Sequence, residues 1–409
     1  MKKVLCIAVA AWLCMVAGNG RAVAQMPGFT DTGQRLGTTP AEGVALGDVD
    51  RDGDLDAFVV NTILFGNTVW TNVDTQRGTF ADSGQSLGAS NSWAVALGDV
   101  NRDGWLDAFV ANYDGQANIL YLNDRDGTFT DSGVGYGARH SSDVALGDLD
   151  GDGDLDAFVA NDQGDPNTVW FNLTINRTGP AQSGVFTDTM QRLHAENSTS
   201  VALDYLDGDN WLDAFVTNAG QADRVYINNG QGTFVSLQIL GADHGQDVAL
   251  GDLDNDGDVD AFVANSRLQP DTVYMNNGDG TFTDSGQALG AGNSSSVALA
   301  DFDGDGDLDA VVAVRGQDNN TNVDVIWEND GNGVFTDSGL TLSSTDASAV
   351  AVGDLDNDRA TDVFIVVSGV GFTSGNRVWI NDYVAPKKKR KPAVGGGGGG
   401  GCFLRVLGD

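Results

Sequence analysis

One fifteen-residue pattern recurs along this chain, and it limits the possible folds more than any other feature. Its clearest copy, GDLDGDGDLDAFVAN from Gly147 to Asn161, places five aspartates in a short loop and then turns apolar. Seven copies follow one another about fifty residues apart. Their first loop positions are Asp48, Asp99, Asp148, Tyr205, Asp252, Asp301 and Asp354. Repetition at this period is typical of propellers and solenoids, in which each unit buries its apolar face against its neighbours.

Each repeat contains four short segments with strand character. An apolar run such as DVALGD precedes the acidic loop, LDAFVAN follows it, and segments such as NTVWFN and TFTDSG come after glycine-rich turns. No segment sustains the 3.6-residue period of a helix. The pattern predicts an all-β chain that forms a seven-bladed β-propeller of four-stranded blades. A parallel β-solenoid is the alternative, but its coils are usually shorter and need not close.

The two ends of the repeat array favour a closed ring. Strands of the FTD type begin at seven phenylalanines, of which Phe29 precedes the first acidic loop, and none follows the last segment, RVWIN from Arg377 to Asn381. The array is therefore permuted by one strand. We expect the N-terminal strand to complete the last blade and to leave no open sheet edge.

Segments outside the repeats indicate export and a separate tail. Residues 1–24 combine Lys2 and Lys3 with a short apolar run and an AVA cleavage signal, which predicts a secretory signal peptide. That run is too short to span a bilayer, and no later segment is long enough. Residues 25–384 are assigned to the propeller, and residues 385–409 to a basic, glycine-rich, disordered tail with Cys402. We expect a secreted or cell-surface protein; the periplasm is the alternative location.

The charge of the chain points to cations as partners. The net charge is −36, the only glutamates are Glu42, Glu196 and Glu328, and every lysine lies in the predicted signal peptide or tail. Nucleic acid is an improbable partner, because phosphate binding relies on lysine and arginine. The bias toward aspartate indicates a geometric need for the shorter side chain.

The acidic loop has the donor pattern of a calcium site. Aspartates at loop positions 1, 3, 5 and 9, with glycine at position 6 and a backbone carbonyl at position 7, form an oxygen-only cage. Ca²⁺ takes six to eight such oxygens at about 2.3–2.6 Å. Two carboxylates 4 Å apart repel each other by about 4 kcal/mol at an effective dielectric constant of 20, so the empty cage is strained. An EF-hand is excluded, because position 12 is a valine within a strand rather than a bidentate glutamate.

The predicted calcium ligands come from six of the seven loops, with position 7 contributing its carbonyl. They are Asp48, Asp50, Asp52, Asp54 and Asp56 in loop 1; Asp99, Asn101, Asp103, Trp105 and Asp107 in loop 2; Asp148, Asp150, Asp152, Asp154 and Asp156 in loop 3; Asp252, Asp254, Asp256, Asp258 and Asp260 in loop 5; Asp301, Asp303, Asp305, Asp307 and Asp309 in loop 6; and Asp354, Asp356, Asp358 and Asp362 in loop 7. We expect five good sites. Loop 7 is a doubtful site because Arg359 occupies position 6, and loop 4 is a poor one because Tyr205 and Asn210 replace aspartate and glycine.

The repeats resemble the FG-GAP/VCBS family, whose calcium-loop blades also build the heads of integrin α-chains. The resemblance rests on the acidic loop, the LDAF strand and their spacing, and it extends over roughly residues 27–384. It implies a seven-bladed propeller with calcium in the hairpin between the first and second strands of each blade. It implies no single activity, because members include adhesion modules, lectin-like proteins and some lyases.

A second set of polar residues lies just before the first strand in five of the seven blades and predicts a recognition surface on the face opposite the calcium loops. Its members are Asn91, His140, Asn197, His244 and Asn293. We interpret the two histidines as turn residues rather than a metal site. The variable loops from Asn161 to Asn167 and from Val367 to Asn376 extend this surface. An aromatic residue that recurs in every third strand is assigned to packing between blades.

These features favour an exported calcium-binding propeller, monomeric, that acts as a binding or adhesion module for an extracellular glycan or protein. Calcium has mainly a structural role in this interpretation. A polysaccharide-acting lyase or hydrolase and a purely structural surface protein are the alternatives. Against an enzyme, the chain shows no base–nucleophile motif and no blade that departs visibly from the others.

Overall fold

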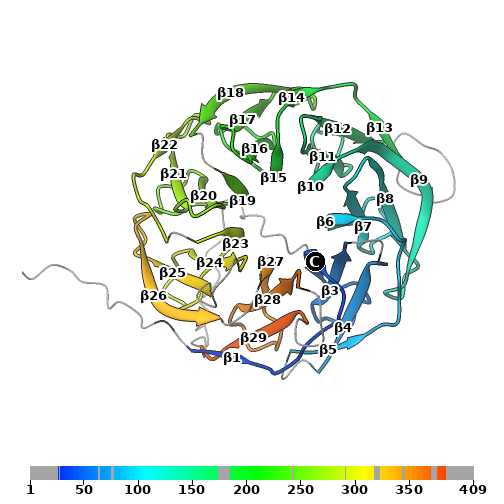
Figure 1. The fold of residues 1–409 in the computed structure, drawn as a ribbon. Helices are drawn as coiled ribbons and strands as arrows, with labels where there is room; N and C mark the ends of the chain where they lie inside the picture. The colour runs from blue at the N-terminus through cyan, green and yellow to red at the C-terminus, as the bar shows by residue number, and fades with distance from the viewer. Residues whose placement is uncertain are drawn as a thin grey trace, which may run out of the picture.

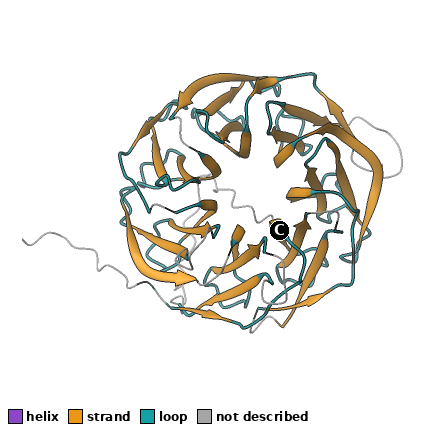
Figure 2. Cartoon of the chain, viewed as in Figure 1, coloured by secondary structure: helices purple, strands orange, loops and turns teal. Residues whose placement is uncertain are grey.

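The fold was analysed in a computed structural model, which describes residues 26, 28–62, 65–74, 78–173, 185–241, 244–290, 292–316, 323–342, 346–369 and 375–383. The predicted signal peptide and the tail with Cys402 lie outside these residues. Within the described part, all regular structure is β-strand (Figure 2). No described segment forms a helix with the length and hydropathy needed to cross a membrane.

Seven antiparallel sheets surround a central axis (Figure 1), which confirms the predicted seven-bladed propeller. Blade 1 comprises β2 (Ala41–Gly47), β3 (Asp56–Asn61), β4 (Thr68–Asp74) and β5 (Thr79–Asp82), and blade 2 comprises β6 (Ser92–Gly98), β7 (Asp107–Asn112), β8 (Gln116–Asn123) and β9 (Phe129–Arg139). Blade 3 comprises β10 (Ser141–Gly147), β11 (Asp156–Asn161), β12 (Pro166–Asn172) and β13 (Phe186–Asp188), and the short β14 (Leu193–Ala195) also pairs with β12.

Blades 4 to 7 follow the same order from the axis outward. Blade 4 comprises β15 (Ser198–Asp204), β16 (Asp213–Asn218), β17 (Asp223–Asn228) and β18 (Phe234–Leu240), and blade 5 comprises β19 (Gly245–Gly251), β20 (Asp260–Asn265), β21 (Thr272–Asn276) and β22 (Phe282–Asp284). Blade 6 comprises β23 (Ser294–Ala300), β24 (Asp309–Val314), β25 (Asp324–Asn329) and β26 (Phe335–Leu342). Blade 7 comprises β27 (Ala347–Gly353), β28 (Asp362–Val367), β29 (Arg377–Asn381) and β1 (Phe29–Asp31).

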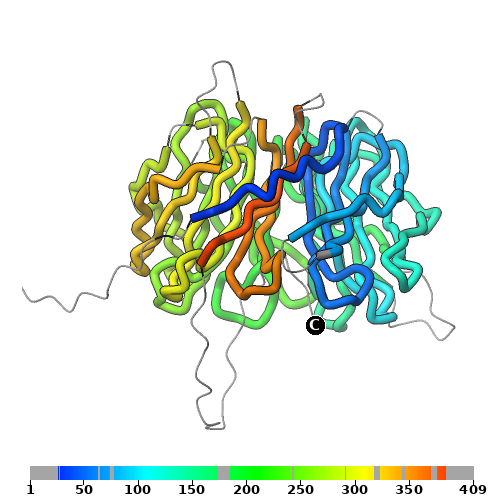
Figure 3. Tube along the Cα trace, turned by 90° about the horizontal axis from the view of Figure 1, so that it is seen from below, coloured from blue at the N-terminus to red at the C-terminus, as the bar shows by residue number. Residues whose placement is uncertain are grey.

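The ring closes as the sequence predicts. The N-terminal strand β1 pairs antiparallel with β29, the last strand of the chain, with Phe29 opposite Asn381. Figure 3 shows the two strands, dark blue and orange-red, side by side across the wall of the ring. At this junction the ring of Phe29 packs edge-on against Phe302 of blade 6, with 5.6 Å between the centroids. The N-terminal strand therefore completes the last blade and packs it against blade 6.

The hydrophobic core is divided into seven clusters, each between two adjacent blades. One cluster, for example, joins Phe158 and Ala160 of blade 3 to Val201 and Tyr226 of blade 4. The phenylalanine of LDAF packs edge-on against the outer-strand phenylalanine of the next blade, as Phe158 does with Phe234 at 5.2 Å. The second strand of each blade is buried along its whole length, because both of its faces meet other blades. This burial explains why an apolar segment follows each acidic loop.

The recurring third-strand aromatic residue is buried in every blade, at 1–9% exposure. Its members are Trp70, Tyr121, Trp170, Tyr226, Tyr274, Trp327 and Trp379. These rings pack within the inter-blade clusters and are not available as stacking platforms for a ligand.

Candidate metal centre

Each acidic loop connects the first strand of its blade to the second. In blade 3 the first strand ends at Gly147, which pairs with Asp156, the first residue of the second strand. Loop positions 1 to 8 therefore form the hairpin turn, and position 9 is the first residue of the buried second strand. The same pairing occurs in all seven blades. All seven loops therefore lie on one face of the propeller.

The aspartate at position 1 is held by the loop backbone, and in loops 1, 5 and 6 it keeps one oxygen free for a ligand. In loop 1, Oδ2 of Asp48 accepts a hydrogen bond from the amide of Gly53 at 3.1 Å. Its Oδ1 is buried and has no hydrogen-bond partner among the described residues, as is also the case for Oδ1 of Asp252 and of Asp301. A buried carboxylate oxygen without a partner is costly unless a cation faces it. The oxygen-only donor set fits a hard cation of the calcium type.

Position 6 turns the chain through the left-handed region of backbone space. Gly53, Gly257 and Gly306 have φ values of 98°, 97° and 99° there. Arg359 occupies this position in loop 7 with a φ of 81°, which is unfavourable for a residue with a side chain. In loop 4, Asn210 does not have a positive φ, so this loop follows a different path.

The aspartate at position 9 is buried at the centre of each loop. Oδ2 of Asp260 accepts the amide of Leu253 at 2.9 Å, and Oδ1 accepts the amide of Asn276 at 2.8 Å. Burial raises the pKa of Asp260 to about 7, and that of Asp309 to about 8, because the charged form loses its hydration. A divalent cation would offset the same desolvation cost and hold these groups ionised.

The structure brings the carboxylates of positions 1, 3 and 9 to within 4.8 Å of one another in loops 1, 3, 5 and 6. These groups are Asp48, Asp50 and Asp56; Asp148, Asp150 and Asp156; Asp252, Asp254 and Asp260; and Asp301, Asp303 and Asp309. The position 5 carboxylate instead accepts the amide of position 7, as Asp52 does from Asp54 at 3.0 Å. In loops 1, 3 and 6 the position 7 carboxylate contacts the neighbouring loop, as Asp54, Asp154 and Asp307 do, so we assign only the position 7 carbonyl as a ligand donor.

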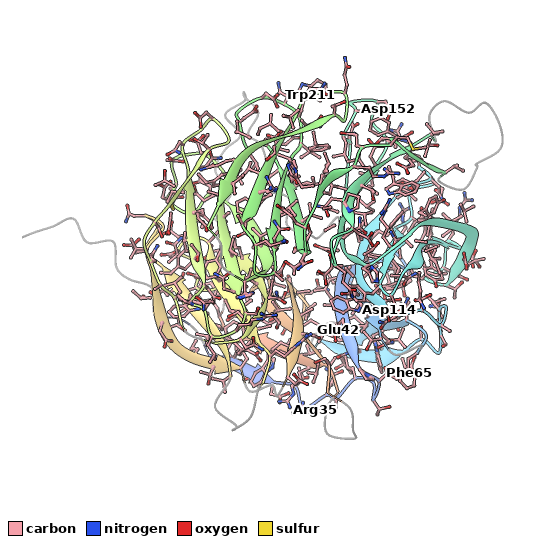
Figure 4. The ribbon with its side chains drawn as sticks, turned by 45° about the horizontal axis from the view of Figure 1, so that its top comes forward. Arg35, Glu42, Phe65, Asp114, Asp152 and Trp211 are labelled. Carbon is pink, nitrogen blue, oxygen red and sulfur yellow. The ribbon has the colours of Figure 1, made fainter. Side chains whose placement is uncertain are left out.

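Loop 4, which the sequence analysis treats as a poor site without naming its ligands, has a converging acidic group of its own. Asp207, Asp209 and Asp213, at positions 3, 5 and 9, also converge within 4.8 Å, although Tyr205 replaces the position 1 aspartate. The signal was present in the sequence, because only positions 1 and 6 depart from the pattern. Trp211, at position 7 of loop 4, covers the adjoining loop 3. A Cβ atom added to Gly151 of loop 3 would lie 2.5 Å from the indole ring of Trp211. Figure 4 shows Asp152 and Trp211 near each other at this rim.

A second missed feature is an asparagine two residues after the buried third-strand aromatic residue of every blade; it ends that strand in all blades but the first, where β4 continues to Asp74. These bridging asparagines are Asn72, Asn123, Asn172, Asn228, Asn276, Asn329 and Asn381. Each is buried, and its amide donates to the position 9 aspartate of its own blade. Regular recurrence two residues after Trp or Tyr is the signal that could have identified them.

The predicted recognition residues lie on the opposite face, where each ends the turn before a first strand. The carbonyls of Asn91, His140, Asn197, His244 and Asn293 all accept an amide from the residue that follows the second strand, at 2.8–2.9 Å. The two histidines occupy equivalent turn positions, as the sequence interpretation holds.

Blades 2 and 3 carry an aromatic cluster on this face that the described residues of the other blades do not repeat. Trp93 stacks on Tyr113 with 4.1 Å between ring centroids, and Tyr113 meets the ring of His140 edge-on at 5.4 Å. The hydroxyl of Tyr113 donates to Asp162 at 2.6 Å, and Nδ1 of His140 lies 3.0 Å from a carboxylate oxygen of Asp165. Figure 4 shows Glu42, at the start of β2, and Asp114, just after β7, well away from Trp211.

Comparisons with known proteins agree with this geometry. The profile described as FG-GAP-like repeat matches residues 99–159, 206–263, 252–312 and 301–365, together more than half of the chain. A search of curated proteins found no match. Among solved structures, BBS1N in complex with ARL6DN, soaked with mercury, is similar with a TM-score of 0.57 at 11% identity, covering 89% of this chain and 98% of that one. A lectin of Agrocybe aegerita that recognises non-reducing terminal N-acetylglucosamine is similar with a TM-score of 0.50 at 18% identity, covering 80% and 86%. At these identities the structural likeness concerns the fold alone.

Proposed function

Because the chain belongs to the FG-GAP-like repeat family, we propose that it is an exported calcium-binding propeller that serves as a binding or adhesion module at or outside the cell surface. The observation that carries the calcium assignment is the buried, unpartnered Oδ1 of Asp48, Asp252 and Asp301 at the centre of converging carboxylates. Bound calcium would neutralise each loop and tie the first strand of a blade to the second. Its role in this proposal is structural.

The proposed ligands are the predicted residues of positions 1, 3, 5 and 9, together with the position 7 carbonyl. The structure adds Asp207, Asp209 and Asp213 of loop 4 as a weaker site that lacks the first carboxylate. Loop 7 keeps its four aspartates, and the backbone of Arg359 still donates to Asp354 at 2.9 Å. The signal peptide of residues 1–24 and the tail of residues 385–409 complete the proposed organisation.

Thermal unfolding with and without calcium tests the metal assignment. A ligand that binds only the folded state adds about 4 kcal/mol per site at a thousand times its Kd. We expect a large rise in melting temperature when calcium replaces EGTA, and a much smaller rise with magnesium, which retains its waters and requires octahedral geometry. An unchanged melting temperature would exclude working calcium sites.

The proposed recognition surface is the face opposite the calcium loops. It centres on the cluster of Trp93, Tyr113 and His140 and on the turn residues Asn91, Asn197, His244 and Asn293. Aromatic rings beside hydrogen-bonding side chains provide the mixed apolar and polar contacts of a ligand site. The similar lectin supports a glycan as the first ligand to test.

A glycan array and a screen against acidic polysaccharides, both in excess calcium, test this surface. We expect binding without turnover, and Trp93→Ala and His140→Ala should weaken it. Trp211→Ala, on the calcium face, serves as the matched control and should leave binding intact. Turnover of a polysaccharide would support the enzyme alternative, and equal loss in all three variants would exclude the proposed surface.

A further inference from the structure

We propose that the calcium loops are energetically coupled around the ring, and that the bridging asparagines are the positioning residues that couple them. This inference rests on the proposed calcium binding. It concerns how occupation of one loop changes the affinity of the next, which the assignment of ligands does not specify.

The bridging asparagine connects the loops of two blades at once. The amide of Asn329 in blade 6 donates to Oδ1 of Asp309, the position 9 ligand of its own loop, at 2.9 Å. Its side-chain Nδ2 donates to the carbonyl of Leu253, at position 2 of loop 5, at 2.8 Å. The amide of Leu253 in turn donates to Oδ2 of Asp260, the position 9 ligand of loop 5, at 2.9 Å. Three hydrogen bonds therefore join two proposed calcium ligands on different blades.

The link between blades recurs at all seven junctions. Nδ2 donates to the position 2 carbonyl of the preceding loop in the pairs Asn72–Leu355, Asn123–Val49, Asn172–Val100, Asn228–Leu149, Asn276–Leu206, Asn329–Leu253 and Asn381–Phe302, at 2.8–2.9 Å. The pair that joins blade 7 to blade 1 closes the circle. The asparagines are buried, so the bonds are shielded from water.

A second contact joins the loops directly at several junctions. The position 4 residue has a positive φ in every loop, and at four junctions its side chain contacts the position 7 residue of the next loop. Asn255 donates to Asp307 at 2.9 Å, and Arg102 lies 2.7 Å from Asp154. Asn357 of loop 7 donates to Asp54 of loop 1 at 2.5 Å, and Arg51 lies over the ring of Trp105. Position 7 thus offers its carbonyl to one loop and its side chain to another.

These contacts give the coupling its sign. An ion that fixes position 9 also fixes position 2 of its loop, and with it the acceptor of the next asparagine. The neighbouring loop then loses less conformational entropy when it binds its own ion, which is positive cooperativity. Loop 4 keeps both of its asparagine bridges, to Leu149 and from Asn276, so the path continues through the weakest metal site.

Loop 2 contains its own reporter. Trp105 at position 7 sensitises the emission of bound Tb³⁺, a calcium substitute, and the difference between the full chain and its Trp105→Phe variant isolates loop 2. Asp150→Asn weakens loop 3 and alters no residue of loop 2. We expect it to raise the Tb³⁺ Kd of loop 2 about fivefold or more, within the usual range of coupling between sites. Asn172→Ala removes the bridge from blade 3 to Val100 and should raise the same Kd about tenfold, as loss of a ligand's supporting contact does.

The double variant separates coupling from general destabilisation. In the Asn172→Ala background, Asp150→Asn should change the Kd of loop 2 by less than half the fold-change it causes in the unaltered chain, because the contact of Arg102 with Asp154 then still joins the two loops. Asn118→Ala is the matched control, because Asn118 is a buried third-strand asparagine at the opposite end, where it accepts the amide of Asn112 at 2.9 Å. It should leave the Kd of loop 2 unchanged. A loop 2 affinity that Asp150→Asn leaves within twofold would overturn the coupling. Absence of sensitised emission from the unaltered chain would overturn the proposed metal binding itself.

Discussion

At one buried position near the start of each third strand, the choice between Asn and Asp determines whether the stability of the blade depends on pH. An Asn or Asp within two residues of the start of each third strand accepts the backbone amide of the residue that ends the second strand. In blade 5 it is Asp271, whose Oδ1 accepts the amide of Asn265 at 2.8 Å while the hydroxyl of Ser294 donates to Oδ2. Burial raises the pKa of Asp271 to about 7. The folded state therefore favours the protonated acid.

Asp271→Asn is expected to stabilise the protein at pH 8 and to change little at pH 4. A carboxyl whose pKa is raised on folding stabilises the native state at low pH, and this contribution is lost as the pH rises from about 4 to about 7. The shift of about three pKa units corresponds to at most about 4 kcal/mol. Asparagine fits the site, because Asn167 in blade 3 donates to Ser198 in the same arrangement.

Urea unfolding at pH 4 and pH 8 measures this effect, and Asn167→Asp is the reciprocal control. It should destabilise blade 3 at pH 8 but not at pH 4. If Asp271→Asn were destabilising at both values of pH, the pKa of Asp271 could not be the cause.

Arg359→Gly is expected to strengthen loop 7. The substitution relieves a non-glycine residue at φ 81°, a strain of about 1–3 kcal/mol, and it removes a positive charge beside the carboxylates. We expect a higher melting temperature in EGTA and a further rise with calcium. Arg359→Ala removes the charge but keeps the strain. If alanine matched glycine in both measurements, backbone strain would have no part in the effect.

At the scale of the strand, β18 of blade 4 differs from the other outer strands. Elsewhere an aspartate lies two residues after the phenylalanine of this strand, and blade 4 has Ser236 instead. Val235, Leu237 and Ile239 alternate along β18 and are 64%, 47% and 60% exposed. The strand pairs only with β17 in its sheet, so an apolar and uncharged outer strand faces solvent. Such edges are prone to association, and natural proteins usually protect them with charge.

Replacing Val235 and Ile239 with lysine is therefore expected to reduce aggregation and to leave the fold intact. Exposed substitutions usually change the free energy of unfolding by no more than about 0.5 kcal/mol. Light scattering on heating and urea unfolding together measure the two effects. Met190→Lys is the control, because Met190 is 74% exposed but isolated in a turn. An equal improvement with this variant would show that β18 has no special role.

The elements themselves were predictable because each repeat carries its own strand and turn signals. The strand patterns, the acidic loops and the FTD strand at Phe29, which precedes the first repeat, sufficed to predict seven blades and the closure of the ring. The contacts between loops were not predictable. Arg51 contacts Trp105 and Asn255 contacts Asp307 through different chemistry, so no common residue type marks the position. The sequence also suggested that no blade is specialised, whereas the stack of Trp93 on Tyr113 and the apolar β18 distinguish blades 2 and 4.

For the whole molecule, charge sets the balance between the empty and the loaded ring. The chain carries a net charge of −36, and its acidic loops are gathered on one face, so repulsion between loops opposes folding in the absence of metal. Loop contacts offset part of this repulsion, including the ion pair of Arg102 with Asp154 and that of Arg125 with Asp103 at 3.1 Å. Bound calcium would remove most of the remainder.

This balance predicts opposite sensitivities to salt. In EGTA, raising NaCl from about 0.01 M to 0.15 M shortens the Debye length from about 30 Å to about 8 Å, so repulsion between neighbouring loops is screened. The melting temperature should then rise by several degrees. In saturating calcium the loops are already neutralised, and the same change in NaCl should have little effect. Calorimetry across the two salt series measures both slopes. Equal slopes would show that repulsion between the acidic loops does not limit the stability of the metal-free ring.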